Sequence, residues 1–210
     1  MEPTFNIGLF PVTAQVNSAG HLSIGGCDLV QLAAEYGTPL YIFDEESLRR
    51  QCREFRAGFN QYYPGTIVAY ASKAYINKAL AVLFKEEGLW LDAVSGGELS
   101  IAQAAGFPAG NIYFHGNNKG TDELKLALQL CVGRIVVDNF FDLERLEALA
   151  KAQGTRPAVL LRLTPGIDPH THRKITTGNV DSKFGFAKEE WEPALRQALV
   201  SPSLDLLGLH

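Results

Sequence analysis

The 210-residue sequence carries 19 Lys and Arg residues against 23 Asp and Glu residues, a net charge of −4 with an isoelectric point near 5.7. This balance argues against a nucleic-acid partner held by a positive surface, and an apolar content of 46% excludes wholesale disorder. No apolar stretch reaches the roughly 20 residues of a membrane span, and the N-terminus lacks the features of a secretory signal. We therefore expect a cytoplasmic protein that does not enter a membrane.

Residues 1–38 contain short alternating pieces that predict small strands or an arm. After Pro39, short apolar runs alternate with longer helical stretches, and successive runs start about 23 residues apart, with the last interval doubled. This spacing fits one strand, one crossover helix and two short loops. The predicted strands are 40–43, 66–71, 89–94, 111–114, 134–137, 158–163 and 204–209.

Helix signals separate these runs. Asp44, Ser95 and Asn139 stand where N-cap residues are expected, each just ahead of a helical stretch. Gly154 is placed to end the helix that Asn139 begins. Pro193 is expected in the first turn of the last helix, which then starts later than its charges suggest.

Cysteine and histidine spacings indicate no metal site and no disulfide framework, because the cysteines are odd in number and lack a Cys-x-x-Cys pair. The cysteines, which we interpret as buried and inert, are Cys27, Cys52 and Cys131. His170, His172 and His210 do not have a metal-ligand spacing.

Alternation of strands and helices predicts a parallel sheet, either a (β/α)8 TIM barrel or a doubly wound open sheet. An open sheet usually carries a glycine-rich loop after its first strand, whereas Phe43 is followed by acidic residues. In a barrel, functional residues gather at the carboxyl ends of the strands, and here each run ends in a polar group, which favours the barrel. The closing residues are Asp44, Ser72 with Lys73, Asp92, His115, Asp138, Arg162 with Thr164, and His210.

Lys73 follows a strongly apolar run, so we expect its amine to be partly desolvated and usable as a nucleophile toward a carbonyl. The alternative is a solvated lysine at the start of a loop. Arg162 lies within an apolar strand and needs an anionic partner, either a bound ligand or an ion pair with Asp92 or Asp138. His115 either contacts a ligand or is a hydrogen-bonded loop histidine.

Nine pieces of sequence, in order, carry a family resemblance. They are Pro39–Asp44, Tyr70–Ala74, Leu91–Glu98, His115–Lys119, Val136–Asp138, Leu161–Gly166, His170–His172, Ser182–Phe186 and Gly208–His210. Together they cover nearly the whole chain, which resembles the fold-type III pyridoxal phosphate (PLP)-dependent decarboxylases.

The resemblance implies a PLP-binding TIM barrel of the alanine-racemase-like kind over residues 39–210, truncated after its seventh strand. Residues 1–38 would then be an arm that pairs with a second, absent β-domain. Lys73 matches the lysine that holds PLP as an internal aldimine, and the resemblance places further cofactor-binding residues around it. These are Asp92, Ser95, His115, Arg162 and His210.

The implied activity is decarboxylation of meso-2,6-diaminopimelate to L-lysine and CO2, in a homodimer with shared active sites and no metal. Two alternatives remain open: a decarboxylase of ornithine or arginine with the same fold, and a non-catalytic PLP-binding barrel. The polar stretch 164–186, which accounts for the doubled interval, is expected to border the active-site mouth.

Overall fold

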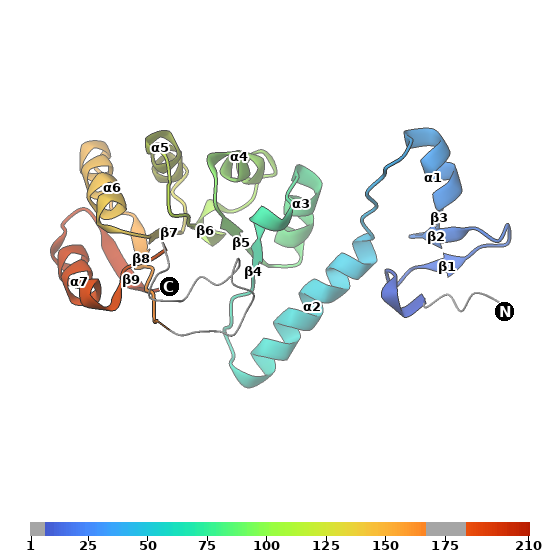
Figure 1. Ribbon diagram of the computed structural model, residues 1–210, viewed down its shortest axis with the longest axis horizontal. Helices are drawn as coiled ribbons and strands as arrows, with labels where there is room; N and C mark the ends of the chain where they lie inside the picture. Colours follow the sequence, from blue (N-terminus) through green and yellow to red (C-terminus); the bar gives the residue numbers. More distant parts are fainter. Residues whose placement is uncertain (1–6, 167–183) are drawn as a thin grey trace. The chain divides into compact units, whose positions relative to one another are not determined.

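The computed structural model describes residues 7–166 and 184–210, which form two compact units (Figure 1). The first unit spans Met1–Val68 and the second spans Ala69–His210. His170 and His172, whose spacing indicates no metal site, lie outside the described residues. The assignment of residues 39–68 to a barrel domain stays a prediction.

The N-terminal unit contains a small antiparallel sheet of order β1-β2-β3, which agrees with the short strands expected before residue 39. Its elements are a 3-10 turn η1 (Ile7–Leu9), β1 (Gln15–Val16), β2 (Leu22–Ile24), β3 (Cys27–Asp28), α1 (Leu29–Tyr36) and α2 (Glu45–Tyr62). Asp28 ends the sheet and caps α1, because its carboxylate accepts hydrogen bonds from the backbone amides of Val30 and Gln31.

The C-terminal unit is a six-stranded, wholly parallel sheet in the order β4-β5-β6-β7-β8-β9, with a helix following each of the first four strands and α7 preceding the last. The strands are β4 (Ala69–Ala71), β5 (Trp90–Ala93), β6 (Ile112–Phe114), β7 (Arg134–Val137), β8 (Ala158–Leu161) and β9 (Asp205–Leu209). The helices are α3 (Lys78–Glu86), α4 (Gly96–Ala104), α5 (Thr121–Gln129), α6 (Phe140–Gln153) and α7 (Trp191–Val200). The 3-10 turns are η2 (Ser72–Ala74), η3 (Ala109–Asn111) and η4 (Lys188–Glu190).

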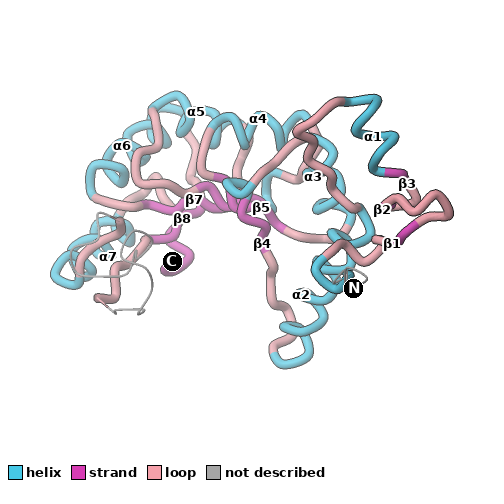
Figure 2. Tube along the Cα trace, turned by 45° about the vertical axis from the view of Figure 1, so that its right-hand side comes forward, coloured by secondary structure: helices cyan, strands magenta, loops and turns pink. Residues whose placement is uncertain are grey.

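These five helices form an outer layer on one side of the sheet (Figures 1 and 2). The core lies between the two layers, where fully buried strand residues such as Phe114 and Ile135 meet helix residues such as Leu124 and Leu143. Because the sheet is strictly sequential and parallel, all six strands present their carboxyl ends at one edge. Six of the seven predicted strands are therefore confirmed, one with the predicted bounds 134–137 and five with shorter bounds.

The strand predicted at residues 40–43 is wrong. This segment has no strand structure and belongs to the N-terminal unit, where Tyr41 is 89% exposed. Its β-branched and aromatic residues fit a strand locally, but a strand also needs a neighbour for its hydrogen bonds. Leu204–Leu209 is consequently the sixth strand of the sheet and not the seventh.

The predicted helix ends are confirmed by their hydrogen bonds. The Asp44 carboxylate accepts from the Ser47 amide, and the Asn139 side chain accepts from the Asp142 amide. Gly154 ends α6 in the left-handed region at φ 63°, which favours glycine. Helix α7 begins at Trp191, so Pro193 lies in its first turn as expected.

The cysteine prediction holds for only one residue. None of the three cysteines is in a disulfide, and Cys52 is buried, whereas Cys27 and Cys131 are exposed. Cys27 begins the two-residue strand β3, and Cys131 lies in the turn after α5. Neither side chain is buried there, although both have apolar neighbours in the sequence. Within the described ranges, no helix is both long and apolar enough to cross a membrane.

Candidate active site

The carboxyl edge of the parallel sheet brings together most of the predicted site residues. Asp92 lies in β5, with Ala71 of β4 as its register partner, while His115 and Asp138 follow directly after β6 and β7. Arg162 and His210 come directly after β8 and β9. Asp44, by contrast, is the N-cap of α2 and belongs to the other unit.

Lys73 lies in the 3-10 turn η2 that follows β4. The expectation of partial desolvation is wrong for this chain, because Lys73 is exposed. Its strand is the outermost of the described sheet and has only one neighbour, so β4 is not covered on both sides. The adjacent Ser72 is buried, and its hydroxyl has no hydrogen-bond partner among the described residues.

Three side chains meet over β5, β6 and β9. His115 Nε2 lies 2.8 Å from Asp92 Oδ1, at ion-pair distance but without hydrogen-bond alignment, so both ring nitrogens lack a hydrogen-bond partner among the described residues. The His115 ring stacks on the His210 ring with centroids 5.9 Å apart. Partial burial is the main cause that lowers the pKa of His210 below its usual 6.5, and the Coulomb effects of the neighbouring His115 and Arg162 add to it.

Arg162 forms the ion pair that the sequence left as one of two alternatives. Its Nη1 donates to Asp138 Oδ1 at 2.9 Å, and its guanidinium lies 4.7 Å from the centre of the Phe184 ring. Asp138 is buried, so this cation supplies the charge compensation that a buried carboxylate requires. The pair holds the guanidinium at the carboxyl edge of the sheet.

Ser95 serves the local helix structure. Its hydroxyl accepts from the Glu98 amide at 3.3 Å and caps α4, as predicted. The Glu98 carboxylate accepts from the Val94 amide, one residue earlier than in a standard capping box. Glu123 accepts from the amides of Gly96 and Gly120 and so joins the N-termini of α4 and α5.

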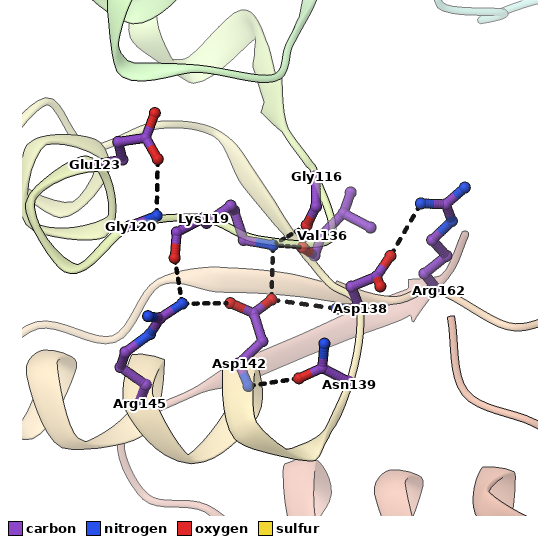
Figure 3. Close-up of polar contacts among 10 residues, drawn as sticks. All are labelled: Gly116, Lys119, Gly120, Glu123, Val136, Asp138, Asn139, Asp142, Arg145 and Arg162. Atoms are coloured by element: carbon purple, nitrogen blue, oxygen red, sulfur yellow. Dashed lines mark hydrogen bonds and ion pairs between the residues drawn. The ribbon is translucent and has the colours of Figure 1, made fainter. Parts of the chain in front are cut away.

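A buried lysine next to the site was given no role by the sequence reasoning. The Lys119 side chain has no exposed area, and its ammonium donates to the carbonyls of Gly116 at 2.8 Å and Val136 at 2.7 Å (Figure 3). It also lies 2.6 Å from Asp142 Oδ2, an oxygen that accepts from the Asp138 amide at 3.2 Å. Lys119 ends the motif His115–Lys119, and nothing local in the sequence signals its burial.

The two lysines differ in what their amines can do. Lys119 has three N–H donors and three acceptors, so its nitrogen has no position left for a reacting carbonyl. Burial lowers its pKa, against the opposing attraction of Asp142 and Asp138. Lys73 is the exposed lysine at this edge, so it is the amine that a ligand can reach.

Comparison with known proteins agrees with this geometry. The sequence model of a family described as "Pyridoxal-dependent decarboxylase, pyridoxal binding domain" matches residues 45–210. The diaminopimelate decarboxylase of Bacillus subtilis (strain 168) is 50% identical over 200 residues, which are 94% of this chain and 46% of that protein. The chain thus spans about half the length of the curated relatives it matches.

Solved structures give the same result. Diaminopimelate decarboxylase from M. jannaschii in co-complex with L-lysine matches with a TM-score of 0.85 at 33% identity, over 95% of this chain and 47% of that one. The Helicobacter pylori enzyme complexed with L-lysine matches with a TM-score of 0.79 at 28% identity, over 87% of this chain and 46% of that one. The prediction of an α/β fold that forms part of a (β/α)8 barrel is confirmed.

Proposed function

The chain belongs to the pyridoxal-dependent decarboxylase family, and from this premise we propose that the protein converts meso-2,6-diaminopimelate to L-lysine and CO2. One observation carries the proposal: an exposed Lys73 at the carboxyl edge of a parallel sheet, beside an array of charged and aromatic side chains. The identity to diaminopimelate decarboxylases supports this choice of substrate.

The residues at this edge fit a bound PLP. The Ser72 hydroxyl and His115 Nδ1 are buried polar atoms without partners in the described parts of the chain, and such atoms normally make a hydrogen bond. Lys73 offers an amine for an aldehyde, and Arg162 offers a positive charge for anionic oxygens. The proposed pocket residues are Lys73, Asp92, Ser95, His115, Arg162 and His210.

Bound PLP would supply an electron sink for the carbanion that remains when CO2 leaves. Lys73 would hold the cofactor through its Nζ amine, which is exposed at the carboxyl edge of the sheet. Asp92 keeps the His115 ring beside the stacked His210 ring, so both imidazoles have a defined orientation. Asp138 keeps the Arg162 guanidinium at the strand end.

The substrate is tested with the full-length protein supplied with PLP. We expect release of CO2 and formation of L-lysine from meso-diaminopimelate, with ornithine and arginine as poor substrates. Faster turnover of ornithine or arginine would contradict this proposal and favour the alternative, a decarboxylase of ornithine or arginine with the same fold. PLP binding without turnover of any of the three amino acids would favour the non-catalytic barrel.

We also propose a homodimer with shared active sites, as the family resemblance implies, and a cytoplasmic location. Three free thiols, two of them exposed, suit a reducing compartment. Light scattering on the full-length protein tests the dimer, since a monomer with full activity would contradict shared sites.

A further inference from the structure

Lys119 makes a three-way junction between separate elements. Its ammonium contacts the carbonyl of Gly116 in the loop after β6, the carbonyl of Val136 in β7, and the carboxylate of Asp142 in the first turn of α6. Removing an ammonium from water is costly, and the cost is offset only when its donors are satisfied. Here all three are satisfied within a fully buried site.

The junction leads to the proposed pocket on two sides, and Figure 3 shows the side that runs through Asp142 and Asp138 to Arg162. On one side, Gly116 directly follows His115, whose ring lies between Asp92 and His210. Gly116 has a φ of 127°, and a Cβ there would lie 3.5 Å from the carbonyl oxygen of Val94, so the loop passes close to the end of β5. A shift of the Gly116 carbonyl would therefore move His115.

On the other side, the oxygen of Asp142 that contacts Lys119 also accepts the backbone amide of Asp138. Asp138 in turn binds Arg162 at 2.9 Å. Arg145 adds a further contact, because its Nη2 donates to the Lys119 carbonyl and lies 3.7 Å from Asp142 Oδ1. One ammonium thus fixes the loop that carries His115 relative to the strand end that carries the Asp138–Arg162 pair.

We propose that Lys119 is a positioning residue, which sets the spacing between His115 and the Asp138–Arg162 pair while never touching cofactor or substrate itself. The expected change in kcat rests on the proposed function. The contacts of Lys119 that form the junction do not depend on which substrate the protein uses. Displacement of pocket groups by about 1 Å costs on the order of 10²-fold in rate, which sets the size of the expected effect.

The test uses the full-length protein and compares Lys119→Met/Asp142→Asn with wild type. The double substitution removes both charges, so no unpaired Asp142 carboxylate remains in the core. We expect a folded protein whose kcat for diaminopimelate falls roughly 10- to 100-fold while KM changes less than about threefold. Hydrogen exchange of peptides covering 115–119 and 138–142 should rise at the same time.

The matched control is Lys125→Met, which removes an exposed lysine of α5 that pairs with Asp122 at 3.3 Å. Its kcat and exchange should equal those of wild type. A folded double variant with wild-type kcat and wild-type exchange overturns the inference. If the double variant does not fold, Asp142→Asn tests the link from Lys119 to α6, because it removes the ion pair and keeps both carbonyl bonds. A folded Asp142→Asn variant with wild-type kcat and wild-type exchange at 138–142 overturns the proposed link between Lys119 and the Asp138–Arg162 pair.

The outcomes also separate this inference from the proposed function. Wild-type protein that fails to decarboxylate diaminopimelate contradicts the proposed function, whatever the variants do. In that case, the exchange measurement still tests the junction, because unchanged protection at both peptides in the folded double variant contradicts positioning by Lys119.

Discussion

Two loops at the carboxyl edge of the sheet each contain a lysine, and the two residues are treated in opposite ways. Lys73, after β4, is exposed and lies beside a buried hydroxyl that has no partner in the described chain. Lys119, after β6, has no exposed area and three satisfied donors. The contrast teaches that a reactive amine needs access, whereas a structural ammonium needs every donor engaged.

Replacement of Lys73 should give the largest effect. We expect Lys73→Ala to lower kcat of the full-length protein roughly 10²- to 10⁴-fold, because the amine proposed to hold the cofactor is lost. Its melting temperature should stay close to wild type, because the side chain is exposed. The control is Lys78→Ala, an exposed lysine at the start of α3, which should retain activity. An equal loss of kcat in Lys73→Ala and Lys78→Ala would contradict a specific role for the Lys73 amine.

Replacement of Lys119 alone should, in contrast to Lys73→Ala, also lower stability. Lys119→Met leaves the Asp142 carboxylate buried without its cation, and breaking a buried pair in this way costs about 3–5 kcal/mol. Lys125→Met removes only an exposed pair and should change the free energy of unfolding by less than about 1 kcal/mol. Urea unfolding of both variants measures the difference, and similar midpoints would contradict the buried role.

The Asp138–Arg162 pair should show an intermediate loss. Arg162→Met leaves buried Asp138 without its partner, at a cost of about 1–3 kcal/mol. The loss should be smaller than for Lys119→Met because the Arg162 side chain is 20% exposed and water can approach the carboxylate. Adding Asp138→Asn should recover part of the loss, and no recovery would show that the ion pair is not its cause.

The smallest expected effect concerns pH. The pKa of His210 is lowered in the folded chain, so between that value and 6.5 the unfolded chain binds the proton and the folded chain does not. The contribution of neutral His210 is therefore complete above pH 6.5 and is lost as the pH falls. Unfolding midpoints at pH 7 and pH 5 should differ less in His210→Gln than in wild type. An equal pH response would rule out this linkage.

The sequence predicted those features of the fold that depend on neighbours along the chain. Hydrophobic runs about one β/α unit apart located six strands, and short polar side chains located the caps at Asp44, Ser95 and Asn139. The run at 40–43 failed because strand pairing is a property of the whole sheet.

The candidate site could be predicted only in outline. The rule that parallel strands share a carboxyl edge placed Asp92, His115 and Arg162 correctly. The exposure of Lys73 and the burial of Lys119 depend on which elements cover them, and both lysines look alike as residues of polar loops. The partner of Arg162 likewise became known only from the register of β7 and β8.

The most direct measurement is to locate the covalent PLP adduct in the full-length protein. Borohydride reduction of the folded, PLP-loaded protein, followed by proteolysis and mass spectrometry, identifies the lysine that carries the cofactor. The account predicts a single modified peptide containing Lys73 and an unmodified peptide containing Lys119. Modification at Lys119, or no stable adduct in protein that decarboxylates diaminopimelate, would contradict it.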